Sequence, residues 1–206
     1  MVHVPYEKDG ATYADLEALP SNLVGEIVSG RLIASPRPAP RHAQASSGLG
    51  VLVGAPFHFG RDGPGGWWIL DEPELHLGQD VLVPDLAGWR RERLPRMPET
   101  AYFELVPDWV CEVISPSTER LDRGEKLEIY RREQVAHVWL VSPLARTVEV
   151  LRLTGEGFLL AVVHAVPGPV RAEPFDAVEL DLGLLFDEPA EPDDPNEPDD
   201  PPGGRG

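Results

Sequence analysis

The stretch between residues 109 and 141 most constrains what this chain can fold into. It opens with the apolar run at residues 109–114, which is typical of a strand buried on both faces, and closes with a second apolar run at residues 137–141. Between them, Ser115-Pro116-Ser117-Thr118 ends the strand and starts a helix expected to reach about residue 133. Two strands joined through a helix run parallel in one sheet, so this segment predicts an α/β (α+β) fold.

Most other elements are predicted to be strands of hairpins. Residues 26–28 and 31–33 flank Ser29-Gly30, a two-residue turn signal. Periodicity and turn residues predict further strands and two more helices: strands at 67–71, 74–77, 83–89, 147–153 and 158–166, and helices at 12–19 and 42–57. Hairpins combined with one parallel crossover indicate a mixed β-sheet flanked by helices.

The formal net charge of −17 is unevenly spread over the 206 residues. Residues 187–206 hold eight carboxylates against Arg205, a local charge of −7, which leaves −10 on residues 1–186. The end segment is rich in proline and has almost nothing to bury, so we expect a domain at 1–186 and a disordered acidic tail at 187–206. An acidic body argues against a broad basic groove, and nucleic acid would have to be contacted locally, through a metal or by an oligomer.

The compartment is expected to be the cytoplasm. No apolar run approaches the roughly 18 residues of a membrane span, and the polar N-terminus has no signal-peptide pattern, so no membrane partner is expected. Cys111 is the single cysteine, which excludes an internal disulfide and a cysteine-rich zinc site. Its place in an apolar strand predicts a small buried hydrophobic residue rather than a nucleophile.

Two carboxylates interrupt apolar runs. Glu112 lies inside residues 109–114 and Asp85 inside residues 81–87, and a lone carboxylate there is costly unless a metal or cation compensates it. Alternate strand residues share a face, so the two carboxylates converge if their strands are neighbours. The helix that follows carries Lys126, one of two lysines in a chain whose other basic residues are arginine. This combination predicts a metal-dependent hydrolase.

The donor atoms favour a hard cation. The carboxylates of Asp85 and Glu112, the backbone carbonyl of Val113 and waters would form an octahedral Mg²⁺ or Mn²⁺ site. Lys126 shares a polar helix stripe with two residues four positions away on either side, Asp122 and Tyr130. From that stripe its amine would orient or deprotonate an attacking water and offset charge in the transition state.

Simpler interpretations of the same residues stay open. Asp85 could cap a strand end after Pro84, and Lys126 could form a solvated helix pair with Asp122. Glu112 could pair with an arginine of the next helix, either Arg120 or Arg123. Packing is the expected role of Tyr130, and a helix cap or surface position that of His42.

Two other function classes also stay open. One is a catalytically silent module that uses the fold to bind a partner, which the acidic body would suit. The other is a glycosidase with Asp85 and Glu112 as its acid and base. A sugar cleft should be lined with exposed aromatic residues, whereas these carboxylates lie in apolar runs, so the glycosidase is the weaker alternative.

A series of short motifs runs along residues 10–165: Gly25-Glu26-Ile27, Gly30-Arg31-Leu32, His42, Pro84-Asp85, Glu112-Val113-Ile114-Ser115-Pro116-Ser117-Thr118, Asp122-Arg123, Glu125-Lys126-Leu127, Tyr130 and Val138-Trp139-Leu140-Val141-Ser142-Pro143. Together they resemble the Uma-type putative restriction endonuclease family of the PD-(D/E)xK nuclease superfamily. The resemblance implies a restriction-endonuclease-like fold and a Mg²⁺- or Mn²⁺-dependent endonuclease, with DNA as the expected substrate. A homodimer would suit an enzyme that cuts two strands.

The same resemblance implies a catalytic set of Glu26, Asp85, Glu112 and Lys126, with Glu26 as an additional metal ligand. In the usual superfamily motif the lysine lies two residues after the acid, and Ile114 occupies that position here. The resemblance therefore implies that Lys126 supplies the amine from the helix. Flanking positions depart from the family pattern at Ser29, at Ser142 and at Gln134-Val135-Ala136-His137.

Overall fold

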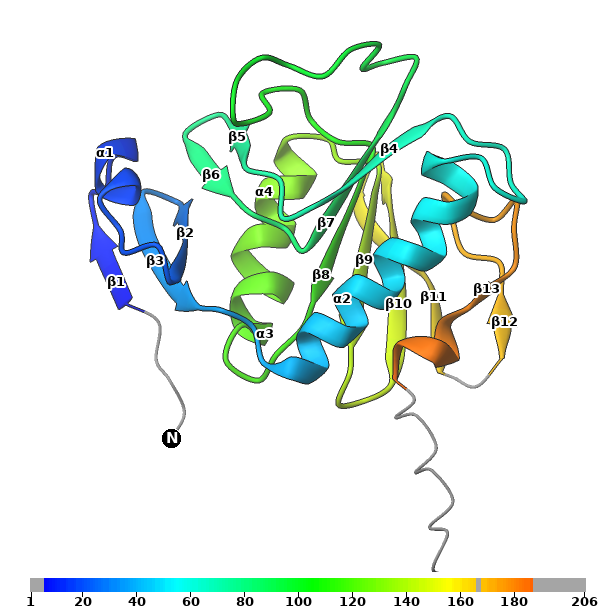
Figure 1. Cartoon of the computed structure of the whole chain (residues 1–206). Helices are drawn as coiled ribbons and strands as arrows, with labels where there is room; N and C mark the ends of the chain where they lie inside the picture. Colours follow the sequence, from blue (N-terminus) through cyan, green and yellow to red (C-terminus); the bar gives the residue numbers. More distant parts are fainter. Residues whose placement is uncertain (1–5, 166–167, 187–206) are drawn as a thin grey trace, which may run out of the picture.

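The crossover segment lies at the centre of a six-stranded sheet, in a computed structural model that describes residues 6–165 and 168–186 (Figure 1). β8 (Trp109–Val113) and β9 (His137–Ser142) pair in parallel, as predicted, and the other neighbours in the sheet are antiparallel. The order is β11-β10-β9-β8-β7-β4, where the remaining strands are β11 (Gly157–Ala165), β10 (Thr147–Thr154), β7 (Leu86–Arg90) and β4 (Trp67–Asp71). This is the mixed sheet, flanked by helices, that the sequence predicted.

The helix between β8 and β9 contains an element that the sequence did not predict. It begins as α3 (Glu119–Leu121) and ends as α4 (Leu127–Arg132), within the predicted range of 118–133. Between these two parts, Asp122–Lys126 form a π-helical turn, η2. Such turns widen a helix locally and are frequent at functional sites.

A second, antiparallel sheet is formed mainly by the N-terminal part of the chain. Its order is β1-β3-β2-β6-β5, with β1 (Tyr6–Asp9), β3 (Arg31–Pro36), β2 (Leu23–Val28), β6 (Asp80–Leu82) and β5 (Leu75–Leu77). The predicted hairpin turn is confirmed, because Ser29 and Gly30 have positive φ angles of 52° and 77°. α1 (Tyr13–Glu17) packs on this sheet and begins with a capping box formed by Thr12 and Asp15.

The apolar run at residues 81–87 is not the continuous strand that the sequence predicted. Pro84 has no N–H for a ladder and a fixed φ angle, and the run divides there. Its first part belongs to β6 of the second sheet, and β7 of the six-stranded sheet starts only at Leu86. Asp85 therefore lies at the bend where the chain passes from one sheet to the other.

The long helix α2 (Pro40–Val53) covers one face of the six-stranded sheet (Figure 1). It starts two residues earlier than predicted, because Pro40 occupies the first turn, where its missing N–H costs nothing. A π-helical turn, η1 (Gly54–His58), completes the predicted span to residue 57. The last described elements lie on the same face: β12 (Pro169–Val170), β13 (Leu180–Asp181) and η3 (Leu182–Leu185).

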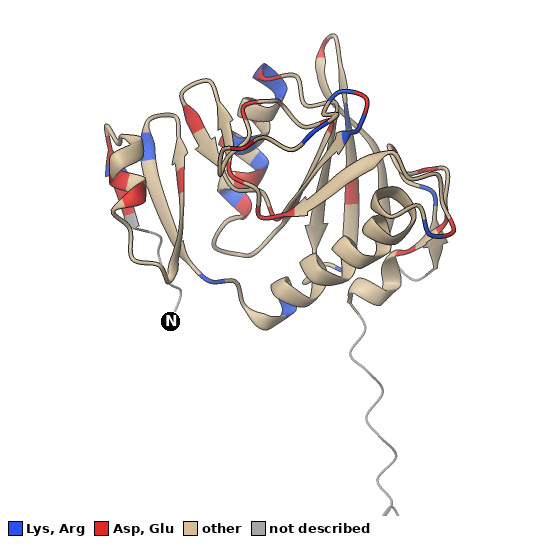
Figure 2. Cartoon of the chain, turned by 45° about the horizontal axis from the view of Figure 1, so that its top comes forward, with Lys and Arg blue, Asp and Glu red and all other residues tan. Residues whose placement is uncertain are grey.

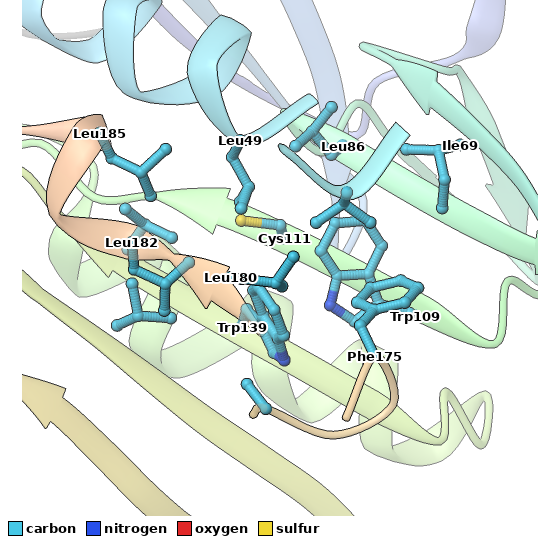
Figure 3. Close-up of a cluster of buried hydrophobic side chains, with 14 of the residues drawn as sticks. Leu49, Ile69, Leu86, Trp109, Cys111, Trp139, Phe175, Leu180, Leu182 and Leu185 are labelled. Atoms are coloured by element: carbon cyan, nitrogen blue, oxygen red, sulfur yellow. The ribbon is translucent and has the colours of Figure 1, made fainter. Parts of the chain in front are cut away.

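The two faces of β8 contribute to two different cores. Trp109, Cys111 and Val113 point into an apolar cluster under α2, where Trp139 and Phe175 pack edge-on against Trp109 (Figure 3). The opposite face packs against the crossover helix through a cluster that includes Val110 and Ile114 of the β8 run, Val138 and Leu140 of β9, and Ile129 and Tyr130 of α4. Cys111 is fully buried, as predicted.

Two expectations from the sequence concern membrane spans and the end segment. Of the helices within residues 6–165 and 168–186, none is both long enough and apolar enough to pass through a lipid bilayer. The acidic tail predicted at 187–206 lies outside the described residues.

Candidate functional site

A cavity of about 460 Å³ opens where residues of the two large sheets meet the start of α2. Its wall comes from β2, the β3–α2 connection, the β6–β7 bend, β8 and the crossover helix. The ionisable groups that line it are mostly carboxylates: Glu26, Glu72, Asp85, Glu112 and Asp122, with Arg37, His42 and Lys126. The four residues of the implied catalytic set, Glu26, Asp85, Glu112 and Lys126, therefore line the same cavity.

Lys126 joins the two sheets through its ammonium group. Its Nζ lies 2.8 Å from Glu112 Oε1 on β8 and 3.0 Å from Glu26 Oε1 on β2. Asp122 Oδ1, one helical turn earlier, is 3.8 Å away. The side chain of Lys126 is only 3% exposed, so this is a buried ion-pair network, not the solvated helix pair considered from the sequence.

The charge state of Lys126 follows from these partners. Burial opposes the charged ammonium, but the attraction of Glu112 and then Glu26 outweighs it and raises the pKa of Lys126 well above its usual value. In this arrangement Lys126 is a cation, and it is surrounded by more carboxylates than it can neutralise.

Glu112 is the carboxylate that the alternation of β8 directs toward the crossover helix. Its Oε1 accepts a hydrogen bond from the Tyr130 hydroxyl at 2.5 Å in addition to the contact with Lys126. Burial raises the pKa of Glu112 well above its usual value, against the opposing attraction of Lys126. Tyr130 thus packs in the core, as predicted, and also holds Glu112.

Asp85 is held at the bend by groups from two other elements. Its Oδ2 accepts the backbone N–H of Val113 at 2.7 Å, and His42 Nε2 of α2 lies 3.3 Å from its Oδ1. Burial raises the pKa of Asp85 to about 7, although the Val113 N–H and the charge of Lys126 oppose the shift. β7 pairs with β8 in the register Leu86–Cys111, which brings Asp85 beside Glu112.

Asp122 and Glu26 complete the acidic wall. Asp122 lies in the π-helical turn with Lys126, and burial raises its pKa to about 6 despite the nearby ammonium. Glu26 Oε1 accepts the backbone N–H of Val83 at 2.8 Å, just before the bend at Pro84. A backbone hydrogen bond thus links the predicted N-terminal acid to the segment that carries Asp85.

The family model of the Uma2 putative restriction endonucleases matches residues 11–184. The chain belongs to the Uma2 family. Among solved structures, the chain resembles a putative nuclease of DUF820 from Anabaena variabilis, with a TM-score of 0.69 and 22% sequence identity over 85% of this chain and 97% of that one. The likeness confirms the predicted fold. No functionally curated protein sequence matches the chain.

The lining of the cavity offers oxygen donors for a divalent cation. In residues 6–165 and 168–186, no three histidine, cysteine or acidic side chains are gathered closely enough to enclose a metal ion as they stand. The Lys126 ammonium lies between Glu26 and Glu112, the position that a metal ion bound by both carboxylates would take. The donor chemistry nevertheless fits, because four buried or half-buried carboxylates face one ammonium and the pKa values of three of them are raised by burial.

Several sequence interpretations are corrected by this geometry. Within the described part of the chain, Glu112 makes no ion pair with Arg120 or Arg123, and Arg123 instead binds Glu119 and Glu149. His42 is neither a cap nor a surface residue, because Ala39 is the N-cap of α2 and the imidazole is 16% exposed inside the cavity. Burial lowers the pKa of His42, so the ring that faces Asp85 is neutral.

Two residues of the cavity, Asp122 and His42, were not expected at the site from their sequence patterns alone. Asp122 was noted only as part of a polar stripe, since a π-helical turn has no sequence signature that would have shown its burial. For His42, the only indication in the sequence of a place at the site was its position in the motif series that resembles the Uma2 family. Its contact with Asp85 depends on how α2 approaches the bend.

The departures from the Uma2 pattern lie outside the lining of the cavity. Ser29 forms the β2–β3 turn and donates its N–H to Asp80. Gln134 adopts a φ angle of 64° after α4, and the Ser142 hydroxyl accepts the N–H of Ala145. These residues shape turns and leave the carboxylate–lysine cluster intact.

Proposed function

We propose that the protein is a divalent-metal-dependent endonuclease that hydrolyses phosphodiester bonds of DNA. The observation that supports this best is the contact of Lys126 Nζ with both Glu112 and Glu26 in the cavity that also holds Asp85. Membership of the Uma2 family agrees with a nuclease function. The four residues of the set that the resemblance implies, Glu26, Asp85, Glu112 and Lys126, all line this cavity, which supports the proposal.

The metal would be held by the oxygen donors at the sheet junction. Asp85, Glu112, Glu26 and the backbone carbonyl of Val113 are the candidate ligands, and a bound Mg²⁺ or Mn²⁺ would supply Lewis-acid polarisation of the phosphodiester. His42 and the Val113 N–H orient the Asp85 carboxylate, while Tyr130 orients Glu112. These contacts keep the carboxylates directed into the cavity.

Lys126 would act on the charge that develops during hydrolysis. Its raised pKa makes it an ammonium, so it donates hydrogen bonds and stabilises negative charge on the phosphoryl oxygens. Burial strengthens this effect, because electrostatic interactions are screened less inside the protein than in water. Arginine would place the charge differently, since its planar fork does not match a compact three-donor ammonium.

DNA would reach the site through local contacts. The mouth of the cavity has Arg37 and three hydroxyl residues, Ser115, Ser117 and Thr118, which can donate hydrogen bonds to phosphate oxygens. Elsewhere in the view of Figure 2, lysines and arginines are interspersed with acidic residues and do not form a broad basic face. Binding should therefore be weak, with a shallow dependence on salt, because few phosphate charges are neutralised.

The direct test is cleavage of supercoiled and linear DNA by the wild type and by Asp85→Asn. We expect cleavage with Mg²⁺ or Mn²⁺, loss of cleavage in excess chelator, and none by Asp85→Asn. Wild-type cleavage that persists in chelator, or an unimpaired Asp85→Asn variant, would refute the proposal. Asp176→Asn, an exposed carboxylate change far from the cavity lining, serves as the matched control.

A catalytically silent binding module is the second candidate. One observation favours it: the ammonium of Lys126 already neutralises part of the acidic cluster without a metal. Titration with Mn²⁺ followed by calorimetry separates the two. A silent module predicts no saturable binding, whereas the nuclease predicts binding that Asp85→Asn removes.

A further inference from the structure

Strand β11 forms an unprotected edge of the six-stranded sheet. It is last in the strand order and pairs with β10 on one side (Figure 1). Within residues 6–165 and 168–186, no strand pairs with its other side. With nine residues it is long for an edge strand, and its outer N–H and C=O groups form a template for another strand.

The side chains of β11 are apolar and exposed along the middle of the strand. Leu159 and Leu160 are each 49% exposed, Val162 is 37% and Val163 46% exposed, and Ala161 between them is exposed as well. Consecutive strand residues point to opposite faces, so a continuous exposed run means that neither face is covered. An exposed apolar run of this kind either binds another protein surface or makes the protein prone to aggregation.

The other edges of the two large sheets are protected. Three of the four residues of β1 are charged, and β5 has only three residues and is bridged to Phe103. On β4, the guanidinium of Arg90 lies 4.6 Å from the Trp67 ring centroid, and that of Arg91 lies 4.0 Å from Trp68. β11 has no charged residue from Gly157 to Ala165, and its one irregularity is the register shift with β10 next to Ala161.

We propose that β11 pairs antiparallel with β11 of a second copy of this chain, which joins two six-stranded sheets into one. With a two-fold axis at Ala161, Leu159 lies opposite Val163 of the other copy and Leu160 opposite Val162. Each large apolar side chain thus meets another, and the smallest residue lies on the axis. Ala161 is also where the register with β10 shifts, since Val162 pairs with Val150 and Leu160 with Leu151.

Charge favours a second copy over another kind of partner. A basic peptide strand would need carboxylates along β11 and an acidic one would need lysine or arginine, and the strand has neither. Two chains of net charge −17 repel each other over most of their surfaces, so association requires a neutral contact. β11 is itself the neutral, apolar, antiparallel strand that its edge fits. The inference does not depend on nuclease activity.

The first test is the mass of the protein in solution, measured by sedimentation velocity over a range of concentrations. We expect a dimer for the wild type and a monomer for Val162→Lys, because an ammonium group would then lie opposite Leu160 of the other copy inside an apolar contact. Val51→Lys is the matched control, since Val51 is 69% exposed on α2 and lies away from β11. A monomeric wild type, or a Val162→Lys variant that stays dimeric, would overturn the proposal.

The second test reports the register directly. In Ala161→Cys the two introduced thiols should meet at the axis within the Cα separation that a disulfide allows, and mild oxidation should give a covalent dimer. Cys111 is fully buried and does not compete. Leu144→Cys, at a residue 78% exposed elsewhere, is the control and should stay monomeric on a non-reducing gel. Equal cross-linking of both variants would show random collision and contradict the pairing.

Discussion

The two faces of β8 are built from the same five-residue strand and have opposite chemistry. Toward α2, Trp109, Cys111 and Val113 pack among aromatic and aliphatic side chains in the cluster around Phe175 (Figure 3). Toward the crossover helix, Glu112 meets the ammonium of Lys126 and the hydroxyl of Tyr130. All five residues of the strand are buried, so burial alone does not distinguish the faces.

The difference shows which face can tolerate change and which can perform chemistry. The apolar face is stabilised by area removed from water and by packing, and these terms do not depend on pH or ions. The polar face carries buried carboxylates in excess of cations, which costs stability and leaves affinity for a further positive charge. Neighbouring residues of β8 thus serve the apolar core on one face and the proposed site on the other.

Glu112→Gln should have the largest effect, because it alters the polar face of β8 and leaves the apolar face unchanged. It keeps the volume of the side chain but removes a charge from the polar face, so divalent-metal affinity should fall by more than the roughly 10–100-fold that follows loss of an outer-shell partner. DNA cleavage should fall to background while circular dichroism stays native. Isothermal titration with Mn²⁺ measures the affinity. Glu99→Gln, an exposed change, should behave as wild type; unchanged affinity in Glu112→Gln would exclude Glu112 as a ligand.

Lys126→Ala tests the cation of the polar face. Phosphodiester hydrolysis should fall by roughly a hundredfold or more, the usual scale for a lost charge stabiliser or general base, while Mn²⁺ still binds. Lys8→Ala is the matched control, because the other lysine makes an exposed pair with Asp15. Lys126→Arg should rescue poorly. Cleavage at the wild-type rate by Lys126→Ala would assign the stabilisation of the developing charge to another group.

Cys111→Ser tests the apolar face next to Glu112. The new hydroxyl would be buried among aliphatic and aromatic side chains, and an unsatisfied polar group there costs about 1–3 kcal/mol. Urea denaturation should show this loss, whereas Mn²⁺ affinity and the cleavage rate of the folded protein should not change. A changed metal affinity would mean that the two faces are coupled through the strand.

The smallest expected effect is the pH dependence of the metal-free protein. The pKa of Asp85 is about 7 in the fold and near 4 when unfolded, so between these values the folded state retains a proton that the unfolded state has lost. Stability should therefore fall as pH rises through roughly 4–7. From pH 6 to 8 we expect a loss of about 1 kcal/mol, or roughly 2–4 °C in Tm.

Asp85→Asn should reduce this pH dependence, because the amide does not titrate, and the dependence that remains belongs to Asp122 and Glu112, whose pKa values are also raised by burial. Thermal melts of the two proteins in chelator, at pH 6, 7 and 8, give the comparison. An exposed substitution such as Asp176→Asn should retain the wild-type slope. A wild-type Tm that rises with pH over this range would show that Asp85 is ionised in the metal-free fold.

Local sequence patterns by themselves indicate much of the secondary structure of this protein and the residues of its candidate site. The apolar run at residues 109–114 and the Ser-Pro-Ser-Thr stop predicted the parallel pair and its crossover helix, and Ser29-Gly30 predicted the hairpin. These features depend on side-chain alternation and on the backbone freedom of neighbouring residues. The motif series identified Glu26, Asp85, Glu112 and Lys126 as one set, and their convergence in one cavity agrees with it.

Only the tertiary structure decided how these residues meet. Because Pro84 divides the apolar run, Asp85 lies at the bend between the two sheets and not in a strand. Asp122 and Lys126 are both buried because they lie in the π-helical turn. The contact between Lys126 and Glu26 spans 100 positions, and that between His42 and Asp85 joins α2 to the bend. Such contacts depend on the packing of whole elements, whose relative positions follow from the burial of all their faces together and not from any local pattern.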